Sequence, residues 1–128
     1  MEFAQKKILN NVKILVYSGN QAGDEGGEAF ADSPYLKNLE NLNMNHNEIG
    51  DDGAIALVNS KNLPKLKTLS IFGNVIGDRG AKAFADSHES KKYQKLDLYK
   101  NQITAAGIKA LNESENLKNC EELEYYVE

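Results

Sequence analysis

The side chains best suited to act as nucleophiles, bases or metal ligands are scarce in this sequence of 128 residues. It contains one cysteine, Cys120, and two histidines, His46 and His88. No set of His, Cys and carboxylate residues has the spacing of a zinc site, and no nucleophile, acid and base form a recognisable catalytic set. Cys120 occupies an apolar position that two other segments fill with leucine, Leu39 and Leu66, so we interpret it as a small buried hydrophobic residue. The sequence therefore predicts no catalytic site, no metal and no other cofactor.

Three aspartates, Asp24, Asp51 and Asp78, recur every 27 residues. A ladder of carboxylates could hold cations, but no glutamate follows at the spacing that closes a calcium loop. Each aspartate instead begins a segment of helical spacing, where a carboxylate can cap the first turn and oppose the helix dipole. Thr104 is expected to do the same in the last copy, where Ala105 takes the aspartate position. The recurring glycines do not form the G-x-x-x-x-G-K-[ST] loop of a phosphate site.

The same period runs through the whole chain. Four asparagines lie 27 residues apart without insertion or deletion: Asn20, Asn47, Asn74 and Asn101. Leucine recurs in the same phase, as in the column Leu15, Leu42, Leu69, Leu96 and Leu123. A fixed period of this length is typical of a repeat array built by stacking copies of one unit. Such an array indicates a binding surface and not a catalytic pocket.

Each unit reads L-x-x-L-x-L-x-x-N-x-I-G-D-x-G-A-x-A-L, and the clearest copy spans Leu39 to Leu57. The first half alternates apolar and polar residues, as a strand does, and the second half has helical spacing. The asparagine between them marks a turn, where its side chain can bond backbone groups of its own and the neighbouring coil. We predict strands near 12–18, 39–45, 66–72, 93–99 and 120–126. We predict helices near 2–9, 24–33, 51–60, 78–87 and 105–115.

This unit resembles that of leucine-rich repeat proteins, and its Gly-Ala-x-Ala-Leu half is similar to the ribonuclease-inhibitor-like subfamily. The resemblance covers nearly the whole chain. It implies an α/β solenoid, a right-handed horseshoe segment with a parallel sheet on its concave face and helices on its convex face. It also implies a protein that binds other proteins and is not an enzyme. The uniform period departs from the alternating, slightly longer units of the best-known members, which affects the curvature and not the fold.

We predict a single leucine-rich repeat domain over residues 1–128. It divides into a half-repeat, four repeats and a terminal strand: 1–11, 12–38, 39–65, 66–92, 93–119 and 120–128. Two explanations of the incomplete end units remain open: the chain is a piece of a longer protein, or the half-units are the caps that hide the core of a solenoid. Glutamates around the last strand favour capping there, because charge on an edge strand discourages further pairing.

Side chains between the strand leucines should face the concave groove in columns about 5 Å apart. Phe72, Tyr99 and Tyr126 share one column and are expected to form an aromatic ladder. Exposed aromatic residues often dominate binding energy because they bury much area at low entropic cost. The other interpretation is that the rings only stack on one another and stabilise the sheet. Six polar neighbours complete the predicted partner-binding set: Asn45, His46, Lys95, Asp97, Lys100 and Glu124.

The overall composition bears on the class of partner. The net charge is only -4, and lysine outnumbers arginine 14 to 1, so neither nucleic acid nor an acidic membrane is indicated. No apolar run is long enough to cross a bilayer, and the N-terminal residues lack the features of a signal peptide. A single cysteine cannot form an internal disulfide. We therefore expect a cytosolic protein, in its own cell or delivered to a host cytosol.

The leading hypothesis is a non-catalytic interaction module that binds a protein or peptide, with an apolar anchor and a basic group, on its concave face. Two alternatives remain open. One is a ligand-sensing or regulatory segment of a larger protein, of the sensor or GTPase-activating type that carries such repeats. The other is a structural unit that self-assembles through its ends, because residues 1–23 carry a net charge of +2 and residues 113–128 a net charge of -5.

Overall fold

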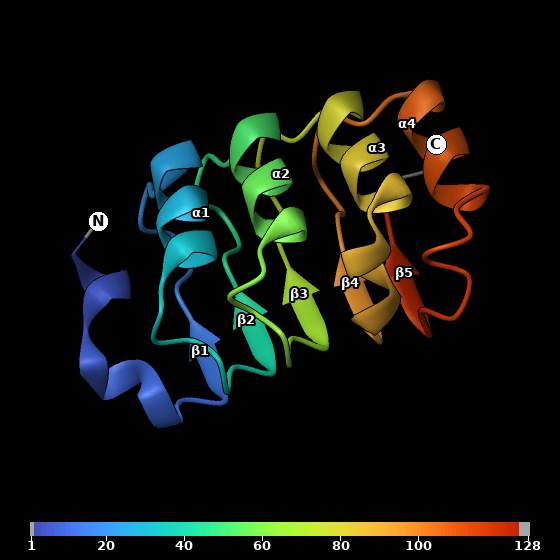
Figure 1. Ribbon diagram of the computed structural model, residues 1–128. Helices are drawn as coiled ribbons and strands as arrows, with labels where there is room; N and C mark the ends of the chain where they lie inside the picture. Colours follow the sequence, from blue (N-terminus) through green and yellow to red (C-terminus); the bar gives the residue numbers. More distant parts are fainter. Residues whose placement is uncertain (1, 126–128) are drawn as a thin grey trace.

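The computed structural model describes residues 2–125, in which strands and helices alternate along the chain (Figure 1). The strands are β1 (Ile14–Val16), β2 (Asn41–Asn43), β3 (Thr68–Ser70), β4 (Lys95–Asp97) and β5 (Glu122–Glu124). The α-helices are α1 (Gly23–Asp32), α2 (Asp51–Asn59), α3 (Asp78–Asp86) and α4 (Ala105–Asn112). Three short 3-10 helices add η1 (Phe3–Gln5), η2 (Lys7–Asn11) and η3 (His88–Lys92).

The strands form one parallel sheet in the order β1-β2-β3-β4-β5. Each residue pairs with the residue 27 positions later, so that Leu42 lies between Leu15 and Leu69. The four α-helices stack beside one another in the same order and cover one side of the sheet (Figure 1). The predicted α/β solenoid is therefore confirmed, and we call the uncovered side of the sheet the concave face.

The apolar columns of the sequence form the core between sheet and helices. In the second coil Leu39, Leu42, Met44, Ile49 and Leu57 are each at most 1% exposed. The cluster continues without a break from Ala4 to Leu117. Burial of so many aliphatic side chains supplies the main driving force for stacking the coils, at about 25 cal/mol for each Å² of apolar surface removed from water.

The helix predicted over residues 2–9 is wrong. The segment forms η1 and η2 instead, separated by Lys6 in an extended conformation with φ -89° and ψ 126°. Ala4 and Leu9 are both buried, yet residues five positions apart do not share a face of an α-helix. The extended residue between two short turns lets both side chains reach the core. Phe3 then stacks on Tyr17 at 5.2 Å between ring centroids.

The recurring asparagines link neighbouring coils through backbone groups. Oδ1 of the buried Asn74 accepts hydrogen bonds from the N–H groups of Asn47 and Ile49, in the preceding coil, at 2.9 and 3.0 Å. Its Nδ2 donates to the carbonyl oxygens of Met44 and Ile71 at 3.1 and 2.9 Å. One side chain thus bonds backbone groups of two coils and pairs the Asn47 and Ile49 N–H groups and the Met44 carbonyl, while the Ile71 carbonyl also accepts from Asn101 Nδ2 at 3.0 Å. The predicted role between coils is confirmed for Asn47, Asn74 and Asn101, whereas the Asn20 side chain bonds only within its own coil.

The aspartates also act between coils, which corrects the prediction that each caps its own helix. Oδ1 of Asp51, the first residue of α2, accepts hydrogen bonds from the N–H groups of Gly77 and Gly80 at the start of α3, at 2.8 and 2.9 Å. Asp51 lies beyond the N-cap position of its own helix, so its carboxylate reaches the next helix N-terminus. A Cβ on Gly80 would lie 2.9 Å from that oxygen, so the glycine makes the approach possible.

The expected cap at Thr104 is wrong for the same reason. Thr104 makes no side-chain bond to its own helix. Its N–H donates to Asp78 Oδ1 at 2.8 Å, and its hydroxyl donates to Asp78 Oδ2. These hydrogen bonds lower the pKa of Asp78 below its ordinary value of 3.8, and the hydroxyl group contributes the larger effect.

Replacing Asn74 by alanine should lower the free energy of unfolding by about 3 kcal/mol, because the N–H groups of Asn47 and Ile49 and the Met44 carbonyl lose this partner. Asn20→Ala is the matched control: this asparagine is exposed, and its Nδ2 donates only to the Ser18 carbonyl. The control should cost less than about 1 kcal/mol in urea denaturation. Equal losses in the two variants would contradict the bridging role.

Asp51→Ala should destabilise the protein by about 1–2 kcal/mol, the usual cost of a lost helix cap. Its neighbour Asp52 provides the control, since it forms only an exposed ion pair with Arg79 at 2.7 Å. Asp52→Ala should change stability by no more than about 0.5 kcal/mol. Thermal unfolding of both variants measures the difference, and a loss at Asp51 as small as at Asp52 would exclude capping between coils.

Candidate functional site

The concave face changes in character along the array. The register confirms the predicted columns, in which Ile14 lies beside Asn41 and Val16 beside Asn43. Ile14 and Val16 on β1 are each 65% exposed. The next two strands present neutral polar side chains, and the last two present charged ones: Asn41, Asn43, Thr68 and Ser70, followed by Lys95, Asp97, Glu122 and Glu124. One open surface therefore offers apolar, polar and charged regions in sequence.

Three rings lie together where the central strands end. The ring centroids of Phe72 and Tyr99 are 5.7 Å apart with an angle of 31° between the planes. The His46 ring meets Phe72 edge to face at 5.2 Å. Tyr126, the predicted third member of the ladder, lies outside the described residues. We call His46, Phe72 and Tyr99 the aromatic row.

A recurring left-handed turn positions this row. His46, Gly73 and Lys100 occupy equivalent positions and have φ values of +56°, +70° and +55°. A Cβ on Gly73 would lie 2.4 Å from two atoms of the His46 ring. The glycine thus leaves the space in which the imidazole rests against Phe72. The sequence shows the recurring position but not which side chain would lie over it.

Two of the predicted polar residues hold the backbone beneath the rings. Asn45 Oδ1 accepts hydrogen bonds from the Phe72 N–H at 2.8 Å and the Ser70 hydroxyl at 2.7 Å. Asp97 Oδ1 accepts from the Tyr99 N–H at 3.0 Å. Both side chains therefore orient residues that carry the rings, a positioning role that the sequence did not indicate.

The predicted charged residues are only partly gathered around the row. Lys95 on β4 forms an ion pair with Glu122 on β5, with Nζ and Oε2 3.5 Å apart. Lys100 is exposed in its left-handed turn, and Glu124 is exposed at the end of β5. Since Glu122 offsets Lys95, the two carboxylates of Asp97 and Glu124 against the single ammonium of Lys100 leave this end of the face with a small excess of negative charge.

The described part of the chain offers little support for a metal site or a reactive nucleophile. Within residues 2–125, no group of three or more His, Cys, Asp or Glu side chains could hold a metal ion. Burial raises the pKa of the Cys120 thiol, which disfavours its nucleophilic thiolate. None of the helices in this range is long and apolar enough to cross a membrane.

Comparison with known proteins identifies the family. The family model described as Leucine Rich repeat matches residues 35–58, 62–85 and 94–111, just over half of the chain. The chain therefore belongs to the leucine-rich repeat family. A search of curated proteins found no match.

Solved structures share the architecture. The tropomodulin C-terminal domain of Caenorhabditis elegans superposes with a TM-score of 0.65 at 13% identity, over 91% of this chain and 72% of that one. Leiomodin-1 actin-binding site 2 superposes with a TM-score of 0.71 at 17% identity, over 95% of this chain and 75% of that one. At such identities the similarity establishes the fold alone.

Gly73→Ala should destabilise the protein by more than the roughly 1 kcal/mol that a left-handed alanine costs, because the His46 ring must also move. Gly19→Ala is the matched control, since Gly19 has φ +67° and no atom within 4 Å of an added Cβ. NMR should show shifted Phe72 ring resonances only in the Gly73 variant. Unchanged Phe72 resonances would contradict the proposed packing of His46 over this glycine.

Proposed function

We propose that this chain is a non-catalytic interaction module that binds a protein or peptide on its concave face. The observation that carries the proposal is the aromatic row on the uncovered side of the sheet. Phe72 and Tyr99 are only half-buried, so a partner could still remove aromatic surface from water. Rings pre-positioned by Asn45 and Asp97 lose little conformational entropy on binding, which favours affinity.

The chemistry around the row indicates the kind of partner. Its rings suit an apolar side chain, while Asp97 and Glu124 suit a lysine or arginine beside it. Lys95, Lys100 and Asn45 belong to the same proposed surface, and Tyr126 is the next position of the column in the sequence. The interpretation that the rings only stabilise the sheet predicts no loss of binding when they are removed.

The solved relatives suggest where to look first. The leiomodin-1 domain is named for binding actin, which supports a protein ligand and makes actin the first candidate partner to test.

We also propose that the Gly-Ala-x-Ala-Leu helices belong to the ribonuclease-inhibitor-like subfamily and that the protein acts in the cytosol. The predicted repeats remain our proposal for the domain, and Phe3 of the first half-repeat packs against Tyr17 and Phe30 of the next unit.

The double variant Phe72→Ala/Tyr99→Ala tests the proposal. Binding of actin, and of proteins captured from the native lysate, should weaken at least tenfold, about 1.4 kcal/mol, because aromatic anchors carry much of the energy of an interface. Isothermal titration with each purified partner measures the affinity.

The matched control is Ile8→Ala/Val75→Ala, which removes two exposed apolar side chains outside the sheet. This variant should bind as the unmodified protein does, and circular dichroism should show both variants folded. Equal affinity of the ring variant and the control for every captured protein would reject the aromatic row as the binding site.

A further inference from the structure

The loops that lead into strands β2 to β5 form a basic edge of the molecule. We define it by residues 37–40, 64–67, 91–94 and 118–121. These loops hold six of the 14 lysines of the chain and only two acidic residues, Glu40 and Glu121: the lysines are Lys37, Lys65, Lys67, Lys91, Lys92 and Lys118. The edge thus carries a net charge of +4 in a chain whose total is -4.

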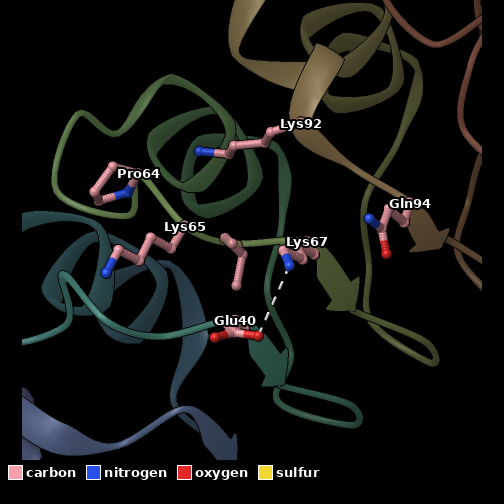
Figure 2. Close-up of a pocket in the computed structure, with 7 residues that line it drawn as sticks. Glu40, Pro64, Lys65, Lys67, Lys92 and Gln94 are labelled. Atoms are coloured by element: carbon pink, nitrogen blue, oxygen red, sulfur yellow. Dashed lines mark ion pairs between the residues drawn. The ribbon is translucent and has the colours of Figure 1, made fainter.

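A hollow of about 410 Å³ lies in the middle of this basic edge. Lys65, Lys67 and Lys92 line it together with Glu40, and Pro64 adds apolar surface to the wall. Figure 2 shows these side chains reaching the hollow from three successive coils, with Lys67 beside Glu40. The stacking of coils therefore brings together lysines that are separated in the sequence.

The basic edge does not neutralise its own charge. Lys67 Nζ lies 4.0 Å from Glu40 Oε1, the outer limit of an ion pair, and both side chains are more than a third exposed. Lys65 Nζ donates to a neutral group, Asn38 Oδ1, at 3.1 Å. Three lysines line the hollow with one glutamate, Glu40, and the nearby Glu89 is shared between Lys92 and Lys61, so the net charge stays positive.

Lys92 is the most enclosed of these cations. Its side chain is 17% exposed, its Nζ donates to the Leu63 carbonyl oxygen at 2.9 Å, and it lies 3.9 Å from a Glu89 oxygen. Burial lowers the pKa of this lysine, which means that its charged form is not fully solvated. A ligand carboxylate in the hollow would supply the missing stabilisation.

The chemistry of the basic edge favours acidic polypeptide over nucleic acid. The basic edge has no arginine that could bind a phosphate through two parallel hydrogen bonds. Its aromatic residue, Tyr93, is 2% exposed and cannot stack on a base. The apolar wall at Pro64 offers a place for a small hydrophobic side chain between acidic ones.

We propose that the basic edge is a second docking surface, which binds an extended acidic segment of a partner protein. Carboxylates of the segment pair with Lys65, Lys67 and Lys92, and an apolar side chain enters the hollow beside Pro64. This surface lies outside the concave face, so the proposal goes beyond the interaction at the aromatic row and does not depend on it.

Fluorescence anisotropy with a labelled, glutamate-rich peptide that carries one leucine tests this proposal. Lys65→Glu/Lys67→Glu should weaken binding at least about tenfold, because each change replaces attraction by repulsion. Binding by the unmodified protein should also weaken as NaCl is raised. The matched control is Lys82→Glu/Lys109→Glu, which changes net charge equally through exposed lysines on α3 and α4.

The control should change affinity less than about twofold, and Phe72→Ala/Tyr99→Ala should bind the peptide as the unmodified protein does. Equal weakening by both lysine variants, or no binding at low salt, would overturn the proposal. So would tighter binding of a single-stranded oligonucleotide or of phosphatidylserine vesicles than of the peptide. Loss of peptide binding in the ring variant would place the peptide on the concave face, overturning this inference while leaving the proposed function standing.

Discussion

The structure depends on satisfying the backbone at the turn from each strand into its helix. Asn47 and Asn74 are buried there, and each side chain accepts from N–H groups of the preceding coil and donates to carbonyl groups of both coils. A buried backbone group without a partner costs about 1–3 kcal/mol, so a coil alone would be penalised at this turn. The asparagine therefore couples each coil to the next and requires the same turn in every copy. In the sequence, the asparagine accordingly recurs at the same position of each 27-residue repeat.

The same coupling extends to both surfaces of the array. Asp51 reaches the N-terminus of the following helix, and the strands pair in strict register. Equivalent exposed positions of successive coils then lie side by side at the spacing of the strands. The side chains at these positions can differ from coil to coil while the backbone framework stays the same. Rings accumulate in one such column, and lysines accumulate where the loops enter the strands. In both cases stacking brings together side chains from successive coils.

The phase of the repeat was enough to predict the core columns, the centres of the strands and the columns on the concave face. The repeat pattern did not show in which direction a polar side chain points, toward its own coil or toward the next. Asp51 was expected to cap its own helix, because spacing cannot show that its carboxylate points to the next coil. The helix expected over residues 2–9 failed because two buried side chains there need an extended link. Contact between Phe72 and Tyr99 could be predicted because the strand register places them side by side. The position of the His46 ring over Gly73 and the hollow between the lysines depend on side-chain conformations, which the repeat pattern does not give.

Amide hydrogen exchange in the Asn74→Ala variant tests the central coupling most directly. The N–H groups of Asn47 and Ile49 belong to the preceding coil and bond to the Asn74 side chain. Coupling between coils predicts that these two amides lose protection by orders of magnitude, while amides in the core of β4 exchange only with global unfolding. Unchanged protection at Asn47 and Ile49, with losses confined to the coil that carries the substitution, would contradict the account.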